Sequence, residues 1–166
     1  MRELRHRRSC RLAMSIPIRV FGTDYKGKDF FEDTTTLVVN QHGAKIRLVR
    51  QLVPEQEILL VSRSTDKEAL FRVVSKVTGP DANCTYWGVE CLAPEKNIWG
   101  IQFPELHATD QVSVRLMIQC PVCGTRDVLY LDEPTVQSLE STGGVTRGCL
   151  VCRTEGLWKP IPYREV

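Results

Sequence analysis

Two pairs of cysteines constrain this 166-residue chain more than any other feature. They are Cys120-Pro-Val-Cys123 and Cys149-Leu-Val-Cys152. A C-x-x-C turn lets two sulfurs face one cation, and Gly124 and Gly148 are placed to give the two turns backbone freedom. Four thiolates complete a tetrahedral shell and leave no open coordination position, so the pattern predicts a structural metal site and not a catalytic one.

Zinc is the expected metal, with iron in a rubredoxin-like site as the alternative. The 25 residues between the pairs (124–148) exceed the usual spacing, and residues 134–141 read as one short helix that takes up the excess. A redox dithiol is the competing interpretation, but it needs one C-x-x-C and a βαβ context that is missing here. Seven cysteines, an odd number, with four in metal-binding spacing favour a reduced compartment, so we expect a cytoplasmic protein.

Short β-strand patterns fill the chain before the cysteines, and no helical periodicity interrupts them. Six strands are predicted, at Ile16–Gly22, Thr34–Asn40, Ala44–Val49, Glu57–Ser62, Ala69–Val77 and Thr85–Leu92. Val112–Gln119 alternates as a further strand and leads into Cys120. Regular strands separated by turn residues predict an all-β, antiparallel barrel or sandwich.

Positive charge is concentrated at the N-terminus. Residues 1–11 carry five arginines against Glu3, a sum of +4, whereas the remaining 17 positive and 19 negative side chains sum to −2. This segment has no apolar h-region, and no stretch of the chain approaches the roughly 18 apolar residues of a membrane helix. The pattern indicates an anion-seeking segment, which we call the arginine arm (residues 1–15).

The arm and the strand after it resemble the start of PilZ domains, bacterial six-stranded barrels that bind cyclic di-GMP. Arg7 and Arg11 match the family's R-x-x-x-R pattern before the first strand. The second family motif, [D/N]-x-S-x-x-G, aligns with Val38–Gly43 (VVNQHG) and keeps only its glycine. Tyr86–Glu90 also looks like the family, and the resemblance covers about residues 5–105.

The resemblance implies a cyclic di-GMP site. Its expected ligand-binding residues are Arg7, Arg8, Arg11, Asn40, His42 and Gly43. Guanidinium groups fork onto phosphate oxygens or the guanine edge and stack on purines. Valine at position 38 offers no acceptor for a guanine, which removes part of the base recognition, whereas Asn40 can still donate and accept hydrogen bonds.

These features predict an arm (1–15), a PilZ-like barrel (16–107) and a zinc-ribbon-like four-cysteine unit with one short helix (108–166). The expected function is a cytosolic cyclic di-GMP-binding module that relays binding to a protein partner. The alternative is a degenerate barrel that binds no nucleotide and acts as a zinc-ribbon adaptor. Residues 120–166 carry five cations and six acids, which disfavours nucleic acid there, and Trp158 with the tail after it is a candidate protein anchor. Three dispersed histidines and no nucleophile–base signature argue against an enzyme.

Overall fold

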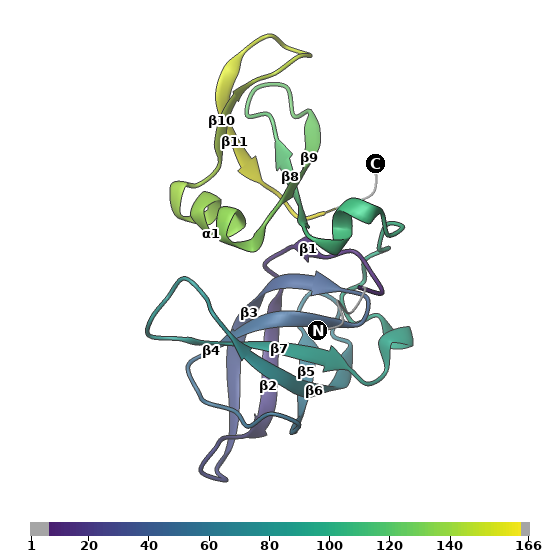
Figure 1. Ribbon diagram of the computed structural model, residues 1–166, viewed down its shortest axis with the longest axis vertical. Helices are drawn as coiled ribbons and strands as arrows, with labels where there is room; N and C mark the ends of the chain where they lie inside the picture. The colour runs from purple at the N-terminus through teal and green to yellow at the C-terminus, as the bar shows by residue number, and fades with distance from the viewer. Residues whose placement is uncertain (1–6, 164–166) are drawn as a thin grey trace, which may run out of the picture. The chain divides into compact units, whose positions relative to one another are not determined.

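The computed structural model describes residues 7–163, which form two compact units (Figure 1). The barrel spans Ser15–Phe103. The second, which we call the cysteine unit, combines residues 7–14 with residues 104–163. The described part of the arginine arm therefore folds with the cysteines, and Arg2 and Arg5 lie outside the described residues.

Six strands form the barrel, and all of their pairings are antiparallel. They are β2 (Pro17–Thr23), β3 (Asp29–Asn40), β4 (Gly43–Leu48), β5 (Glu57–Ser62), β6 (Glu68–Val77) and β7 (Thr85–Cys91). Their order is β3-β2-β5-β6-β7-β4, and β4 pairs back onto β3 to close the sheet. The predicted six-stranded antiparallel barrel is confirmed.

Alternating side chains explain why these segments close around one core. In β2, Ile18 and Val20 are fully buried, whereas Phe21 points to the outer face and is exposed. Phe71 of β6 lies inside and packs edge-on against Trp99, with ring centroids 5.9 Å apart. A closed barrel with one apolar face leaves no sheet edge unpaired, so burial of these residues supplies most of its cohesion.

Strand β8 (Val114–Gln119) is the centre of the cysteine unit. It pairs antiparallel with β9 (Arg126–Leu131) and β11 (Glu155–Pro160), and β11 pairs with β10 (Val145–Gly148). The two-residue strand β1 (Leu12–Ala13) joins β8 in parallel, with Leu12 opposite Arg115. The strand predicted before Cys120 is therefore confirmed, and it is flanked on both sides.

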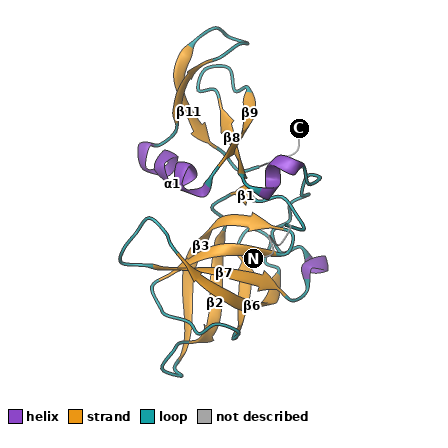
Figure 2. Ribbon diagram, in the orientation of Figure 1, coloured by secondary structure: helices purple, strands orange, loops and turns teal. Residues whose placement is uncertain are grey.

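One α-helix lies between β9 and β10, as predicted (Figure 2). Helix α1 (Glu133–Thr142) begins after Asp132, whose carboxylate accepts a hydrogen bond from the Thr135 N–H, and ends at Gly143 with a φ of 83°. These are the N-cap and C-cap chemistries that the flanking residues predict. Two 3-10 turns, η1 (Pro94–Lys96) and η2 (Ala108–Gln111), complete the secondary structure of residues 7–163. Among these residues, each helix is too short or too polar to cross a lipid bilayer.

Candidate metal centre and arginine arm

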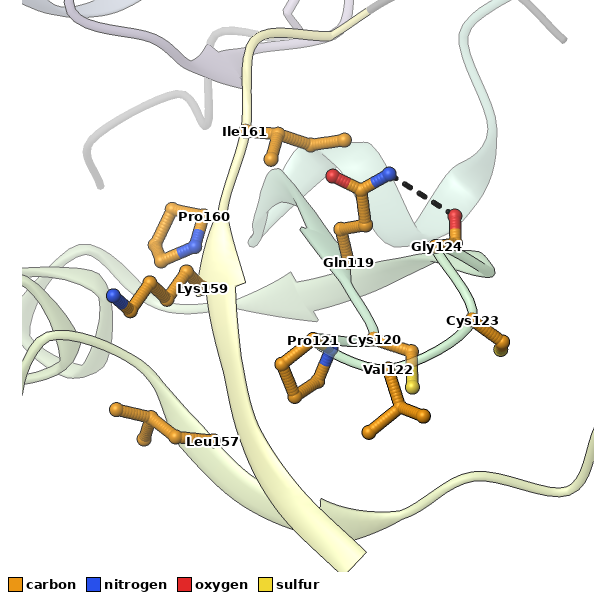
Figure 3. Close-up of a pocket in the computed structure, with 10 residues that line it drawn as sticks. All are labelled: Gln119, Cys120, Pro121, Val122, Cys123, Gly124, Leu157, Lys159, Pro160 and Ile161. Atoms are coloured by element: carbon orange, nitrogen blue, oxygen red, sulfur yellow. Dashed lines mark hydrogen bonds between the residues drawn. The ribbon is translucent and has the colours of Figure 1, made fainter. Parts of the chain in front are cut away.

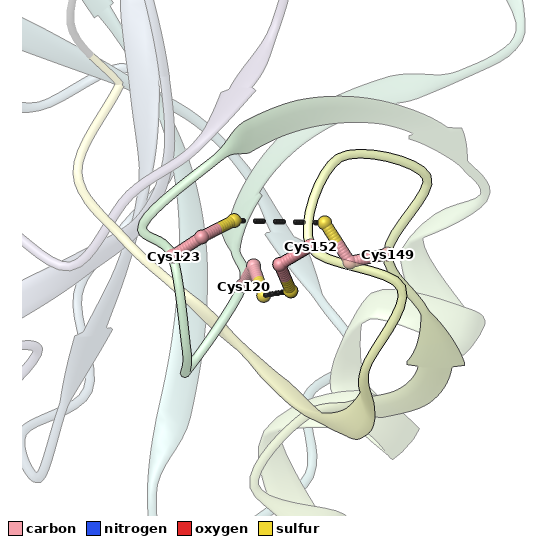
Figure 4. A group of neighbouring side chains, drawn as sticks. All are labelled: Cys120, Cys123, Cys149 and Cys152. Carbon is pink, nitrogen blue, oxygen red and sulfur yellow. Dashed lines mark hydrogen bonds between the residues drawn. The ribbon is translucent and has the colours of Figure 1, made fainter.

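The four paired cysteines converge at one point (Figure 4). All four Sγ atoms lie within 4.8 Å of one another; the Cys120–Cys152 pair is 3.8 Å apart and the Cys123–Cys149 pair 3.6 Å. A tetrahedron with metal–sulfur bonds of about 2.3 Å has edges of about 3.8 Å, whereas a disulfide requires about 2.05 Å. The four sulfurs are therefore spaced for one tetrahedral ion and are not bonded to each other.

The two turns have the same backbone hydrogen bonds. In the first, the Cys120 N–H donates to the Thr125 carbonyl (2.8 Å) and the Gly124 N–H to the Cys120 carbonyl (3.2 Å). In the second, the Cys149 N–H donates to the Thr154 carbonyl (3.1 Å) and the Arg153 N–H to the Cys149 carbonyl (2.9 Å). One residue thus holds the equivalent place in each turn, four positions after its first cysteine.

That equivalent place requires a left-handed backbone. Gly124 has a φ of 78°, as predicted, but the second turn uses Arg153 with a φ of 62°. Gly148, the predicted source of freedom there, is part of β10 and is not in the left-handed region, so that expectation is wrong. An arginine in this conformation costs more than a glycine, which indicates that the surrounding turn is well determined.

Hydrogen bonds in the turns favour the thiolate form of two cysteines. The Thr125 hydroxyl and backbone N–H lower the pKa of the exposed Cys123 thiol to about 6. Backbone N–H groups of Cys152 and Val151 lower the pKa of Cys149. Despite a hydrogen bond from the Thr154 N–H, burial and the Cys120 and Cys149 thiols raise the pKa of Cys152. Because thiolates and not thiols are the metal ligands, the environments of Cys123 and Cys149 fit the chemistry of a soft or borderline cation.

Apolar side chains protrude from both turns. The exposed fractions of Val122, Leu150 and Val151 are 61%, 90% and 69%. Beside the first turn is an open pocket of about 630 Å³, whose lining includes Leu157 and Lys159 of β11 (Figure 3). These exposed aliphatic groups form an apolar surface at the tips of the two cysteine turns.

Trp158 takes no part in that surface, so the expectation that it anchors a partner is wrong. Its side chain is 2% exposed, and the Arg147 guanidinium stacks 4.6 Å from the centroid of its indole. The indole packs in the interior of the unit, at the pairing of β10 and β11. Because side chains alternate along a strand, Leu157 and Lys159 on either side of Trp158 point outward.

The arginine arm is bound within the cysteine unit. The Gln111 side chain makes two hydrogen bonds to the main chain of Arg7. The Gln111 side-chain oxygen accepts from the Arg7 N–H (2.8 Å), and the Gln111 side-chain nitrogen donates to the Arg7 carbonyl (3.4 Å). The Arg7 guanidinium donates to the carbonyls of Asp110 (3.3 Å) and Gln111. Burial lowers the pKa of this guanidinium, although the nearby Glu133 opposes that effect.

Arg11 forms an ion pair with Glu133, the first residue of α1. Its guanidinium also donates to the Ser113 carbonyl (3.4 Å), and its main-chain carbonyl accepts from the Arg115 N–H (2.9 Å). The Arg11 Nε is buried without a hydrogen-bond partner among the described residues. Burial and the neighbouring positive charge of Arg7 lower the pKa of Arg11, and the Glu133 carboxylate opposes both effects.

A buried ion pair between Asp110 and Arg115 lies next to the residues that bind the arginine arm. Asp110 is 0% exposed, and both of its oxygens accept from Arg115, at 2.9 and 2.7 Å. Burial alone would raise the pKa of Asp110, but hydrogen bonds from Arg115 and from the His107 N–H outweigh it and lower that pKa. This pair was not predicted from the sequence. The available signal was Arg115 itself, a cation in the middle of an apolar strand, which requires a buried carboxylate.

Asn40, His42 and Gly43 have structural roles in the hairpin between β3 and β4. The Asn40 side-chain oxygen accepts from the His42 N–H (2.9 Å), and the His42 carbonyl accepts from the Cys91 N–H (2.7 Å). A Cβ at Gly43 would lie 2.2 Å from the Val89 carbonyl oxygen. The six predicted ligand residues thus divide between the two units: these three belong to the barrel, whereas Arg7, the exposed Arg8 and Arg11 belong to the cysteine unit.

No protein-family model matches the sequence, and the curated proteins contain no match to it. Two solved structures resemble the fold. The Bacillus subtilis inhibitor of motility, MotI/DgrA, is 13% identical with a TM-score of 0.43, over 64% of this chain and 46% of that one. The Borreliella burgdorferi PlzA protein, solved in complex with c-di-GMP, is 12% identical with a TM-score of 0.34, over 74% of this chain and 68% of that one. The chain therefore spans about half the length of the first, and the resemblance to both PilZ-like proteins is a distant one.

Proposed function

We propose that the protein is a regulatory binding module whose arginine arm binds cyclic di-GMP and whose zinc-bound cysteine unit contacts a protein partner. In this proposal the protein works in the cytoplasm and catalyses no reaction. The PilZ-like sequence of the arm, with Arg7 and Arg11 in the R-x-x-x-R pattern, supplies the identity of the ligand.

The observation that carries the proposal is the excess of guanidinium groups over carboxylates in the described part of the arm. Among the described residues, Arg7 and Arg11 both lie near the Glu133 carboxylate, whereas the Asp110 carboxylate is taken by Arg115. The buried Arg11 Nε still has an N–H to donate within the described part of the chain. A phosphate group satisfies both needs, since it brings negative charge and several acceptor oxygens to a forked donor.

Zinc is the metal proposed for the four cysteines. Cys120, Cys123, Cys149 and Cys152 would hold it as thiolates, and its role is to join the two turns and so fold the unit. The test is elemental analysis of protein purified without chelator. We expect one equivalent of zinc per chain; iron at one equivalent would change the metal, and neither element would contradict the site.

The partner surface is proposed at the apolar tips of the two turns. Val122, Leu150 and Val151 are exposed, and the pocket beside the first turn continues this surface toward Leu157. Burying exposed aliphatic groups against a partner is favourable, because it removes apolar surface from water.

A second candidate, the adaptor that binds no nucleotide, is favoured by the hairpin residues. Asn40, His42 and Gly43 are explained by backbone hydrogen bonds and close packing, and Val38 is buried. None of these contacts requires a guanine. In this case the zinc-bound surface would be the whole function.

Calorimetric titration of cyclic di-GMP separates the two candidates. We expect wild-type protein to bind, the Arg7→Ala/Arg11→Ala variant to lose binding, and the matched Arg126→Ala/Lys159→Ala variant, which removes two exposed cations of the same unit, to bind normally. Zinc content and thermal unfolding show whether the variants are folded. No heat from wild-type protein at high micromolar ligand would favour the adaptor.

A further inference from the structure

The contact between the arginine arm and helix α1 suggests how the arm is regulated. Arg11 and Glu133 are separated by more than a hundred residues in sequence, yet they form a half-buried ion pair, with side chains 13% and 32% exposed. Glu133 is the first residue of α1, but the N-cap of this helix is Asp132, so capping does not explain why Glu133 points to the arm.

We propose that Glu133 is an intramolecular competitor that occupies Arg11 until an anionic ligand displaces it. The inference rests on the proposed function, because it concerns the same arginines. A carboxylate and a phosphate oxygen bind the same guanidinium donors with the same geometry. The Glu133 carboxylate occupies a donor at Arg11 Nη1 and offsets the charge of that guanidinium, so a phosphate that uses the same donor has to compete with Glu133.

The remaining contacts make the docked arm a defined state and not a loose tail. Gln111 holds the Arg7 main chain at two points, and the Arg11 carbonyl accepts from the Arg115 N–H where β1 begins to pair with β8. A competitor needs such positioning, since an ion pair between two mobile side chains contributes little.

Displacement of Glu133 could also affect the proposed partner surface through helix α1. Helix α1 lies in the chain between β9, which follows the first cysteine turn, and β10, which precedes the second. The carboxylate that the ligand would release is therefore attached to the segment that links the two metal-binding turns. By thermodynamic linkage, any change that stabilises the ion pair lowers the affinity for the ligand. Ligand binding destabilises the ion pair by the same free energy.

The test compares wild type with Glu133→Gln, which keeps the shape of the side chain and removes its charge. Glu155→Gln, at an exposed carboxylate of the same unit, is the matched control. The first measurement is trypsin cleavage after Arg7, Arg8 and Arg11 without ligand, mapped by mass spectrometry. We expect cleavage about 3- to 10-fold faster in Glu133→Gln than in the other two proteins. The second is cyclic di-GMP affinity, which we expect to rise by a similar factor.

The outcomes distinguish the inference from the function on which it rests. Equal cleavage rates in all three proteins would overturn the competitor role, whatever the affinities. Faster cleavage with unchanged cyclic di-GMP affinity would overturn it too. Faster cleavage in Glu133→Gln, with no cyclic di-GMP binding by any protein, would support the internal pair and remove the proposed function.

The salt dependence of cleavage in wild-type protein tests the ion pair without a substitution that could unfold the protein. Raising the salt concentration to about 1 M shortens the Debye length to about 3 Å and weakens a half-exposed ion pair. We expect salt to accelerate cleavage of the arm in wild type and Glu155→Gln but not in Glu133→Gln. Salt-independent cleavage of wild-type protein would contradict the competitor role.

Discussion

The barrel and the cysteine unit reach stability by different means. The barrel is closed by six antiparallel strands around a continuous apolar interior, and no strand in the ring lacks a neighbour. The cysteine unit instead relies on four thiols at one point, a buried ion pair, and a two-residue strand from the other end of the chain. A unit with a small apolar core needs such additions, because burial alone does not offset the entropy of ordering the chain.

This difference suggests that the barrel is a rigid scaffold, whereas the cysteine unit responds to solution conditions. Apolar packing depends neither on bound metal nor on charge screening, whereas ion pairs weaken with salt and the proposed thiolate site needs its metal. The arginine arm belongs to the responsive unit, so its availability is linked to the state of the cysteines and of Glu133. The experiments below test how independent the two units are.

Loss of the metal site should have the largest effect. Cys149→Ser removes one of the four proposed ligands, and structural zinc sites contribute roughly 10–16 kcal/mol in small domains. We expect two-dimensional amide NMR spectra to lose the dispersed signals of β8–β11 while those of β2–β7 persist. The control is Cys84→Ser, at a cysteine outside the cluster. Collapse of both units together would refute their independence.

Removal of the buried carboxylate should come next. Asp110→Asn leaves Arg115 charged, 5% exposed and without its counter-ion, which we expect to cost the cysteine unit about 3–5 kcal/mol. Hydrogen exchange of the peptide 114–119 should accelerate, with peptide 57–62 of the barrel unchanged. The paired change Asp110→Leu/Arg115→Met should be less destabilising than the single one, because it leaves no unpaired charge; a double variant worse than Asp110→Asn would contradict this account.

A smaller effect is expected in the barrel. Gly43→Ala places a Cβ 2.2 Å from the Val89 carbonyl oxygen, so the hairpin has to shift at a cost of about 1–3 kcal/mol. Thermal unfolding followed by hydrogen exchange should show the loss in β3, β4 and β7 only. Gly148→Ala, where nothing lies within 4 Å of the added Cβ, is the control. Unchanged stability with lost cyclic di-GMP binding would assign Gly43 to the ligand instead.

Local patterns were sufficient to predict the barrel strands and the helix. Alternating apolar residues mark β2–β7 within one or two residues at most ends, although β3 begins five residues earlier than predicted. Asp132 and Gly143 mark the ends of α1, and the C-x-x-C spacing marks the four residues that the fold brings together. These predictions succeed because neighbours in sequence decide strand alternation, helix capping and turn formation.

The arm and its surroundings were not predictable in this way. Nothing near Arg11 in the sequence indicates that it meets Glu133, and nothing near Leu12 indicates a parallel pairing with Arg115. The sequence also gives no sign that Arg153 adopts a left-handed backbone. Its role becomes clear only from the matching hydrogen bonds of the two turns.

Local patterns in the chain were thus enough to predict the all-β barrel, the clustering of the four cysteines and the cationic character of the arm. The fold was needed to see that the arm packs with the cysteines, that Asp110 neutralises Arg115, and that Glu133 pairs with Arg11. The two groups of features differ in the sequence separation of the residues involved. Periodicity, spacing and net charge are properties of adjacent residues, whereas the partner of a lone cation or of a two-residue strand is chosen by which distant groups share its buried surroundings.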